Sequence, residues 1–166
     1  MKRIAMSAIA GICAVSLTVA GGTAQERSLS QNLAQVNQIL RSNGYTEEDQ
    51  QTYSHLRLQG DRMIAEITRV RGEARTVNVY ETAVADLDPQ RIRVRTIGAY
   101  AEISLPSRGD VKASLKCETG GITNEWAIPN ASALMLELKP DRALADEIKN
   151  ALVELVQQAK AGLATE

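Results

Sequence analysis

The amino-acid sequence predicts an α+β protein. Its antiparallel seven-stranded sheet, bent or forming a partly open barrel, carries a short N-terminal helix and a C-terminal amphipathic helix. Apolar residues recur at helical spacing in two segments, one beginning at Ser28 and the other following Pro140. Between these segments the apolar period falls to two, and turn residues separate the runs at intervals too short for helices.

The composition favours one folded domain. The chain has 166 residues, of which 44% are hydrophobic and 23% are charged, so it carries enough apolar surface for a core and too little net charge for extended disorder. A formal charge of −1 argues against nonspecific nucleic-acid binding, which depends on many Lys and Arg contacts to phosphates. With no Phe and one Trp, the core volume must come from aliphatic side chains.

Residues 1–24 are predicted to be a secretory signal peptide. Lys2 and Arg3 precede an apolar run, 4–20, which ends in the small-residue site Gly-Thr-Ala at 22–24. We expect cleavage after this site and export to the periplasm or the extracellular space, with no transmembrane segment left in the mature chain. An uncleaved membrane anchor is the competing interpretation of the same run.

Residues 25–61 are predicted to form an N-terminal helix and a linker. Ser28 or Ser30 is expected to cap the helix, and Asn-Gly at 43–44 to end it. Its apolar stripe consists of Leu29, Leu33, Val36 and Leu40. From 45 to 59 apolar residues are too sparse to bury one face, so this stretch is interpreted as a linker with partial helix.

Residues 62–166 are predicted to form the antiparallel β domain. Its seven candidate strands span 62–70, 75–85, 91–96, 100–105, 110–117, 122–128 and 132–138. Cys117 shares its parity with Ala113 and Leu115, so we expect a buried thiol. The final helix carries one continuous apolar stripe: Leu144, Ile148, Leu152, Leu155 and Ala159.

This order of elements resembles the pleckstrin-homology-like fold over residues 62–161. The resemblance rests on the pattern of seven strands followed by an amphipathic helix. In lipid-binding members of that family, basic residues on the first two strands and their loop bind the phosphoinositide. The nearest positions here are Arg69, Arg71 and Arg75, so the resemblance implies an anionic ligand beside them. A lipocalin-like barrel and an open antiparallel sheet packed on helices are alternative folds.

Three arginines, Arg91, Arg93 and Arg95, are predicted to share one face of one strand. Three neighbouring cations repel one another unless carboxylates compensate them or an anion binds there. We therefore consider them candidate ligand-binding residues, together with Arg69 and Arg71. The alternative is a solvated face on which Glu81 or Glu102 pairs with them across the sheet.

No catalytic residue, metal ligand or cofactor is predicted. The one histidine, His55, lies in the predicted linker, far in sequence from Cys117, and no Cys/His spacing suggests a metal site. Asp86 and Asp88 precede a proline, where aspartate is favoured because its side chain bonds nearby amides.

The sequence is most consistent with an exported, noncatalytic binding or interaction module whose partner is an unknown protein or an anionic ligand. Two alternatives are open. A small carboxylate-dependent enzyme would show two close acids with opposed pKa shifts in a pocket. A structural subunit of an envelope assembly would show an exposed apolar patch or an unpaired sheet edge.

Overall fold

The structure is a computed structural model that describes residues 28–164, so the predicted signal peptide lies outside the described residues. The described chain is α+β, as predicted, with two α-helices, α1 (Leu29–Ser42) and α2 (Arg142–Leu163), and two short 3₁₀ turns, η1 (Val84–Asp86) and η2 (Pro89–Arg91). Its strands are β1 (Tyr45–Glu47), β2 (Gln50–Gln59), β3 (Arg62–Arg71), β4 (Ala74–Ala83), β5 (Arg93–Ile97), β6 (Tyr100–Pro106), β7 (Lys112–Thr119), β8 (Ile122–Ala127) and β9 (Ala133–Leu138).

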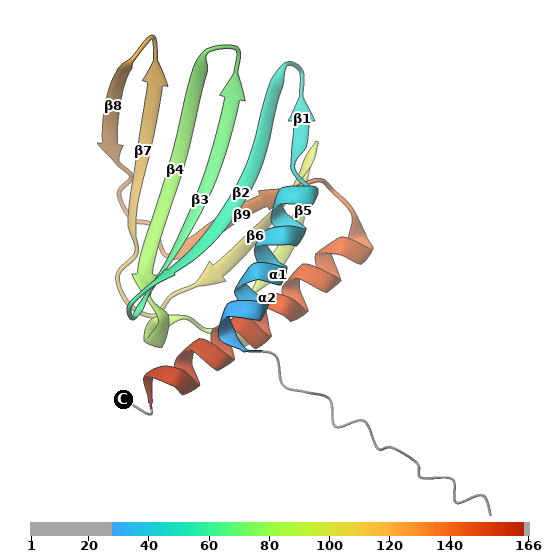
Figure 1. Cartoon of the computed structure of the whole chain (residues 1–166), viewed down its shortest axis with the longest axis vertical. Helices are drawn as coiled ribbons and strands as arrows, with labels where there is room; N and C mark the ends of the chain where they lie inside the picture. Colours follow the sequence, from blue (N-terminus) through green and yellow to red (C-terminus); the bar gives the residue numbers. More distant parts are fainter. Residues whose placement is uncertain (1–27, 165–166) are drawn as a thin grey trace, which may run out of the picture.

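The described strands form two antiparallel sheets that are not closed into a barrel. The large sheet has the order β1-β2-β3-β4-β7-β8, and the small sheet has the order β5-β6-β9. All seven predicted strands are present, but they are divided between two sheets and joined by two further strands. Figure 1 shows that the small sheet crosses behind the lower part of the large sheet, whose strands extend beyond it at the top of the view.

The segment predicted as a linker is a pair of strands, and this part of the prediction is wrong. The residues of β2 that face the interior include Thr52 and Ser54, each 2% exposed, as well as the fully buried Leu56. Because two of these inward positions are polar, the alternation of the strand is hidden in the hydropathy pattern. Strand β2 pairs with β3 and packs on α1, so residues 45–59 belong to the same folded unit as the β domain.

The hydrophobic core lies between the lower part of the large sheet, the small sheet and the two helices. Every residue of the predicted α2 stripe is buried in it, together with Leu134, Leu136 and Leu138 of β9. Burying one such leucine contributes about 1.5 to 3 kcal/mol.

Both predicted helices are confirmed, and both have polar caps. Ser28 forms a capping box with Gln31, and Asp141 accepts a hydrogen bond from the Leu144 amide.

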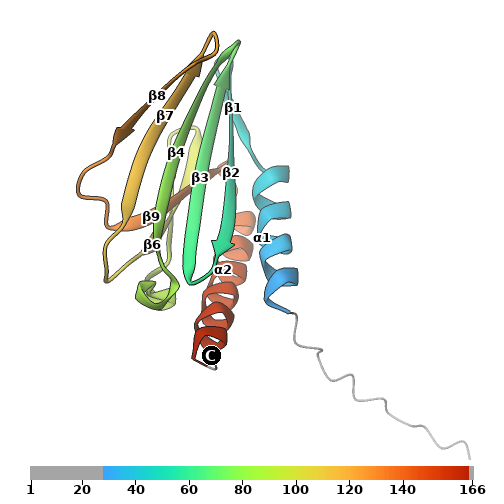
Figure 2. The same ribbon diagram turned by 60° about the vertical axis from the view of Figure 1, so that its left-hand side comes forward.

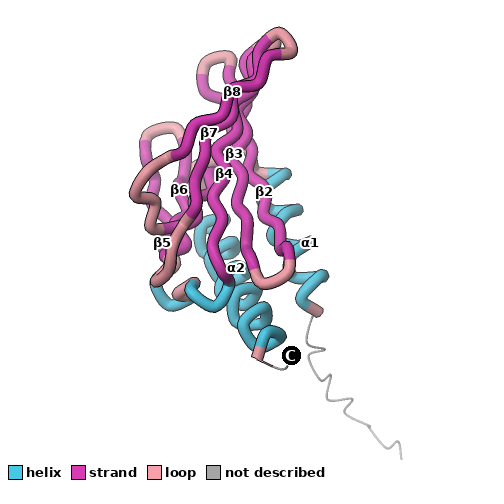
Figure 3. Tube along the Cα trace, turned by 90° about the vertical axis from the view of Figure 1, so that its left-hand side faces the viewer, coloured by secondary structure: helices cyan, strands magenta, loops and turns pink. Residues whose placement is uncertain are grey.

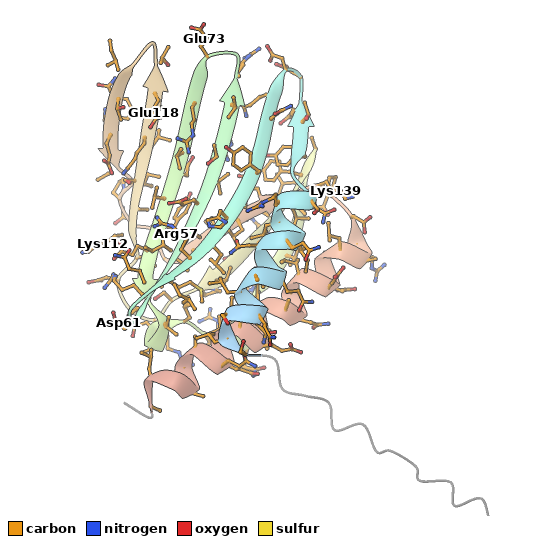
Figure 4. All side chains as sticks on the ribbon, in the orientation of Figure 1. Arg57, Asp61, Glu73, Lys112, Glu118 and Lys139 are labelled. Atoms are coloured by element: carbon orange, nitrogen blue, oxygen red, sulfur yellow. The ribbon has the colours of Figure 1, made fainter. Side chains whose placement is uncertain are left out.

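The face of the large sheet that points away from the core carries ion pairs between neighbouring strands. They are Arg57–Glu66, Arg62–Glu81, Arg75–Glu118 and Lys116–Glu125. Figure 4 shows Arg57 over the lower half of the large sheet and Glu118 near the top of β7. Cations and carboxylates therefore alternate across this outer face and pair with one another, while Ile64, Thr68 and Val77 lie buried among them.

Candidate functional site

A part-buried polar network joins the two sheets at the limit of the core. Arg69 Nη2 contacts Glu137 Oε1 of β9 at 2.6 Å, and Arg69 Nη1 donates to Asn78 Oδ1 at 2.8 Å. The Tyr45 hydroxyl donates to the other carboxylate oxygen of Glu137 at 2.8 Å, and Ser54 bonds the Glu137 backbone. Arg69, a predicted ligand-binding residue, therefore has an internal carboxylate as its partner.

Tyrosines surround this network. The rings of Tyr45 and Tyr100 stack with centroids 5.5 Å apart. Burial, together with the adjacent Glu137 carboxylate, raises the pKa of Tyr45 to about 12. Burial also raises the pKa of Tyr80 and of Tyr100. All three phenols therefore stay protonated at neutral pH and cannot act as bases there.

The other arginines implied by the family resemblance also have carboxylate partners. Arg71 lies 2.7 Å from the Asp49 carboxylate, whose pKa it lowers through a hydrogen bond. Arg75 pairs with Glu118 at 3.3 Å. The strand register places Arg69 on the inner face of the large sheet and Arg75 on the outer face. These arginines do not converge on one ligand position.

The arginines predicted on one strand are divided. Arg91 closes the turn η2, whereas Arg93 and Arg95 lie on β5, so the prediction that all three share a strand is wrong. Arg95 pairs with Glu102 across the small sheet at 3.0 Å. This pairing is the one expected under the alternative of a solvated face. Arg93 and Arg95 line a pocket with Glu102 and Ser104. Anion binding at this pocket stays a prediction.

The groups most able to carry catalysis are kept apart. His55 aligns with Glu66 on the outer face of the large sheet, whereas Cys117 aligns with Thr76 on the inner face. Asp88 accepts hydrogen bonds from Arg108 and from the Gln90 amide, and the Arg108 bond lowers its pKa. Within the described residues, no three His, Cys, Asp or Glu side chains are grouped to hold a metal ion.

The register of Cys117 is as predicted, but its thiol is only half-buried. It lies on the inner face of β7, in line with Ala113 and Leu115. The neighbouring Glu118 lies near the top of β7 in Figure 4, and Figure 1 shows that the strands of the large sheet extend beyond the small sheet at this end. Thr76 Oγ1 lies 3.8 Å from the sulfur, within hydrogen-bond distance.

Strand β8 forms an exposed edge of the large sheet, and all six of its residues are solvent-accessible. Its two large apolar side chains, Ile122 and Trp126, are 67% and 52% exposed. Both lie on the inner face, because they pair with Thr119 and Leu115 of β7. Figure 2 shows that no described element runs along the outer side of β8, and Figure 3, seen from that side, shows no helix in front of it.

The free backbone groups of β8 follow from its hydrogen bonds to β7. The Ile128 amide donates to the Ala113 carbonyl at 2.8 Å, and the amides of alternate residues in an antiparallel strand point to the same neighbour. The backbone groups of Asn124 and Trp126 therefore face β7. Those of Thr123 and Glu125 point outward, where they can pair with another strand.

Other sheet edges in the described structure are protected and β8 is not. Strand β1 has three residues, β5 carries Arg93 and Arg95, and β9 packs against the large sheet. Short length, charge and coverage are the ordinary means of blocking edge-to-edge association. Strand β8 has six residues and a single charged side chain, Glu125, which already pairs with Lys116. It is the edge best suited to accept a further strand.

Sequence reasoning identified segment 122–128 as a strand but did not identify it as a site. The available signal was its low charge combined with an isoleucine and a tryptophan of the same parity. That signal becomes informative only once the strand order shows that β8 has one neighbour.

Comparisons of the chain with protein-family models, with curated proteins and with solved structures found no match. In the described part of the chain, neither helix has the combination of length and apolar character needed to cross a membrane.

Proposed function

We propose that this chain is an exported, noncatalytic interaction module that binds an extended polypeptide along the free edge of β8. The observation that carries the proposal is the coincidence, on one strand, of outward-pointing backbone groups with two exposed apolar side chains. An extended segment that adds to a sheet edge gains main-chain hydrogen bonds along its length. Its side chains then contact those of the edge strand on the same face.

Trp126 is the side chain expected to contribute most to binding. Tryptophan is enriched among residues that dominate interface energies, because its ring removes a large apolar area from water in a rigid form. Ile122 lies four residues away on the same face and extends the apolar surface along the strand. The remaining inward residue of β8, Asn124, supplies a polar contact between them.

Catalysis is less well supported than binding. A carboxylate pair that works as acid and base needs one member with a raised pKa, whereas Arg108 lowers the pKa of Asp88. A thiol nucleophile needs a base beside it, and Cys117 and His55 lie on opposite faces of one sheet. These arrangements favour structural roles for the three side chains.

Export is the second part of the proposal and rests on the residue pattern at 1–24. N-terminal sequencing of periplasmic or secreted material is expected to start at Gln25. Recovery of only the full-length chain in the membrane fraction would contradict export.

The binding surface can be tested by site-specific photo-crosslinking. A photoreactive amino acid at Thr123, whose backbone groups point toward the free edge of β8, is expected to form an adduct with a polypeptide in cells. The same probe at Gln157, an exposed position of α2, is the matched control and should form none. The Thr123 adduct should disappear in a Trp126→Ser background. Equal adduct formation at both positions, or none at Thr123, would contradict the proposal.

A further inference from the structure

We propose that the polypeptide which pairs with β8 is the β8 strand of a second copy of this chain, in an antiparallel, two-fold symmetric arrangement. The inference rests on the proposed function and names the partner of that same site. It follows from the self-complementarity of the strand in one register.

Backbone geometry restricts the possible registers. In an antiparallel pair, residues that exchange hydrogen bonds lie directly opposite each other. Since Thr123 and Glu125 carry the outward groups, each must face an outward residue of the second copy. Ala127 points outward by the same alternation, so a two-fold axis can pass through residue 123, 124, 125 or 126, and in each case side chains of the same face meet. An axis at residue 126 would place Thr123 opposite Pro129, which has no N–H to donate.

The register centred on Asn124 is the favourable one. It places Ile122 opposite Trp126 of the second copy, and the symmetry produces this apolar pair twice. Thr123 then faces Glu125 of the second copy, and these two residues exchange both backbone hydrogen bonds. Asn124 faces its own copy, where the two amide side chains can donate to and accept from each other.

The two neighbouring registers are unfavourable. An axis at Glu125 would place two carboxylates directly opposite each other, which is destabilising. An axis at Thr123 would place Ile122 opposite Asn124, and Trp126 opposite Gly120, which has no side chain to cover the indole ring. The sequence of β8 therefore selects one alignment with itself.

The proposed pairing also fits the charges beside the strand. Glu125 and Lys116 form their ion pair on the outer face of the sheet, away from the apolar pairs. On that outer face Glu125 meets the uncharged Thr123 of the second copy. The pair can therefore form while the existing ion pair is retained, and both exposed apolar side chains leave the solvent.

Disulfide trapping tests this register directly. The variant Asn124→Cys is made with Cys13 and Cys117 replaced by serine, because residue 124 pairs with Cys117 across β7 and β8 and an intrachain bond would compete. In a non-hydrogen-bonded pair the two Cα atoms lie about 4.5 Å apart, within the range that a disulfide spans. Thr123→Cys and Glu125→Cys in the same background are the matched controls, since neither faces its own copy.

Under mild oxidation of the purified chain, Asn124→Cys is expected to form a covalent dimer at least about tenfold faster than either control, because disulfide geometry admits only a short Cα separation. Thr123→Pro removes an outward N–H and leaves the β7 hydrogen bonds in place, so adding it should abolish trapping while the chain stays folded. Equal rates at 123, 124 and 125 would indicate random collision and overturn the inference.

The remaining outcomes separate the two proposals. Fastest trapping at 123 or 125 would overturn the register argued here. No trapping at any position, combined with a Trp126-dependent photo-adduct to a different polypeptide, would overturn self-pairing and retain the proposed function. Absence of both trapping and adduct would overturn both.

Discussion

Helix α2 and strand β8 both present apolar side chains at the period of their own element, but the first set is buried and the second is exposed. In α2, Ile148 and Leu152 are 0% exposed, whereas in β8 Ile122 is 67% and Trp126 is 52% exposed. Periodicity determines which face of an element is apolar. Whether that face is buried depends on the topology, which packs α1 and the small sheet against α2 and brings no described element over β8.

The largest effect is expected where the apolar face is covered. Leu152→Ala deletes a fully buried side chain, so it should reduce the free energy of unfolding by about 2 to 5 kcal/mol. Glu154→Ala, on the exposed side of the same helix, is the control and should change it little. Chemical denaturation measures both. If both variants unfolded at the wild-type midpoint, the assignment of α2 to the core would be wrong.

An intermediate effect is expected at the network that marks the limit of the covered region. Arg69→Met leaves the nearly buried Glu137 carboxylate without its cation, which should cost about 1.5 to 3 kcal/mol. Arg93→Met removes an exposed arginine of the small sheet and should stay within about 0.5 kcal/mol of wild type. Equal denaturation midpoints for these two variants would show that the network does not join the sheets.

The same network predicts a loss of stability at high pH. The pKa of Tyr45 is raised from 10.0 to about 12, so the folded state favours the protonated phenol. This contribution is complete below about pH 10 and is lost as the pH rises through 12. Tyr45→Phe should make stability less dependent on pH in that window and remove the latest component of the tyrosinate absorbance titration. An unchanged titration curve would count against the hydrogen bond from Tyr45 to Glu137.

The smallest effect on stability is expected at the uncovered edge. Trp126→Ser should change the free energy of unfolding by less than about 1 kcal/mol, because the ring is half-exposed and the strand is peripheral. It should nevertheless abolish association, measured by sedimentation. Tyr53→Ser removes another exposed aromatic ring of the large sheet, on the outer face, and should leave association intact. Loss of association in both variants would show that the effect is not specific to β8.

Sequence reasoning worked where burial and apolar character coincide. The α2 stripe is an example, since each predicted position is buried. It failed at β2, where the buried Ser54 is satisfied by the Glu137 backbone and the strand looked like a linker. Arg69 and Glu137 are 68 residues apart, so a single sequence gave no reason to pair them. An arginine that pairs with a buried carboxylate of the same chain and an arginine that binds a ligand have the same sequence pattern.

The candidate site was missed for a topological reason. The sequence predicts a strand at 122–128. The chain inserts β5 and β6 into a different sheet, so β7 joins β4 directly and β8 becomes the outermost strand. The edge position of β8 therefore depends on which distant segments pair, and local periodicity does not predict that pairing.

Amide hydrogen exchange at β8 tests the central claim most directly, because it reports each backbone group of the edge separately. At low protein concentration the outward amides of Thr123 and Glu125 should exchange rapidly, while those of Asn124 and Trp126 are protected by β7. As the concentration rises and copies pair, exchange at Thr123 and Glu125 should slow at least about tenfold, with little change at the inward amides. Unchanged exchange of Thr123 and Glu125 across the whole concentration series would contradict the account.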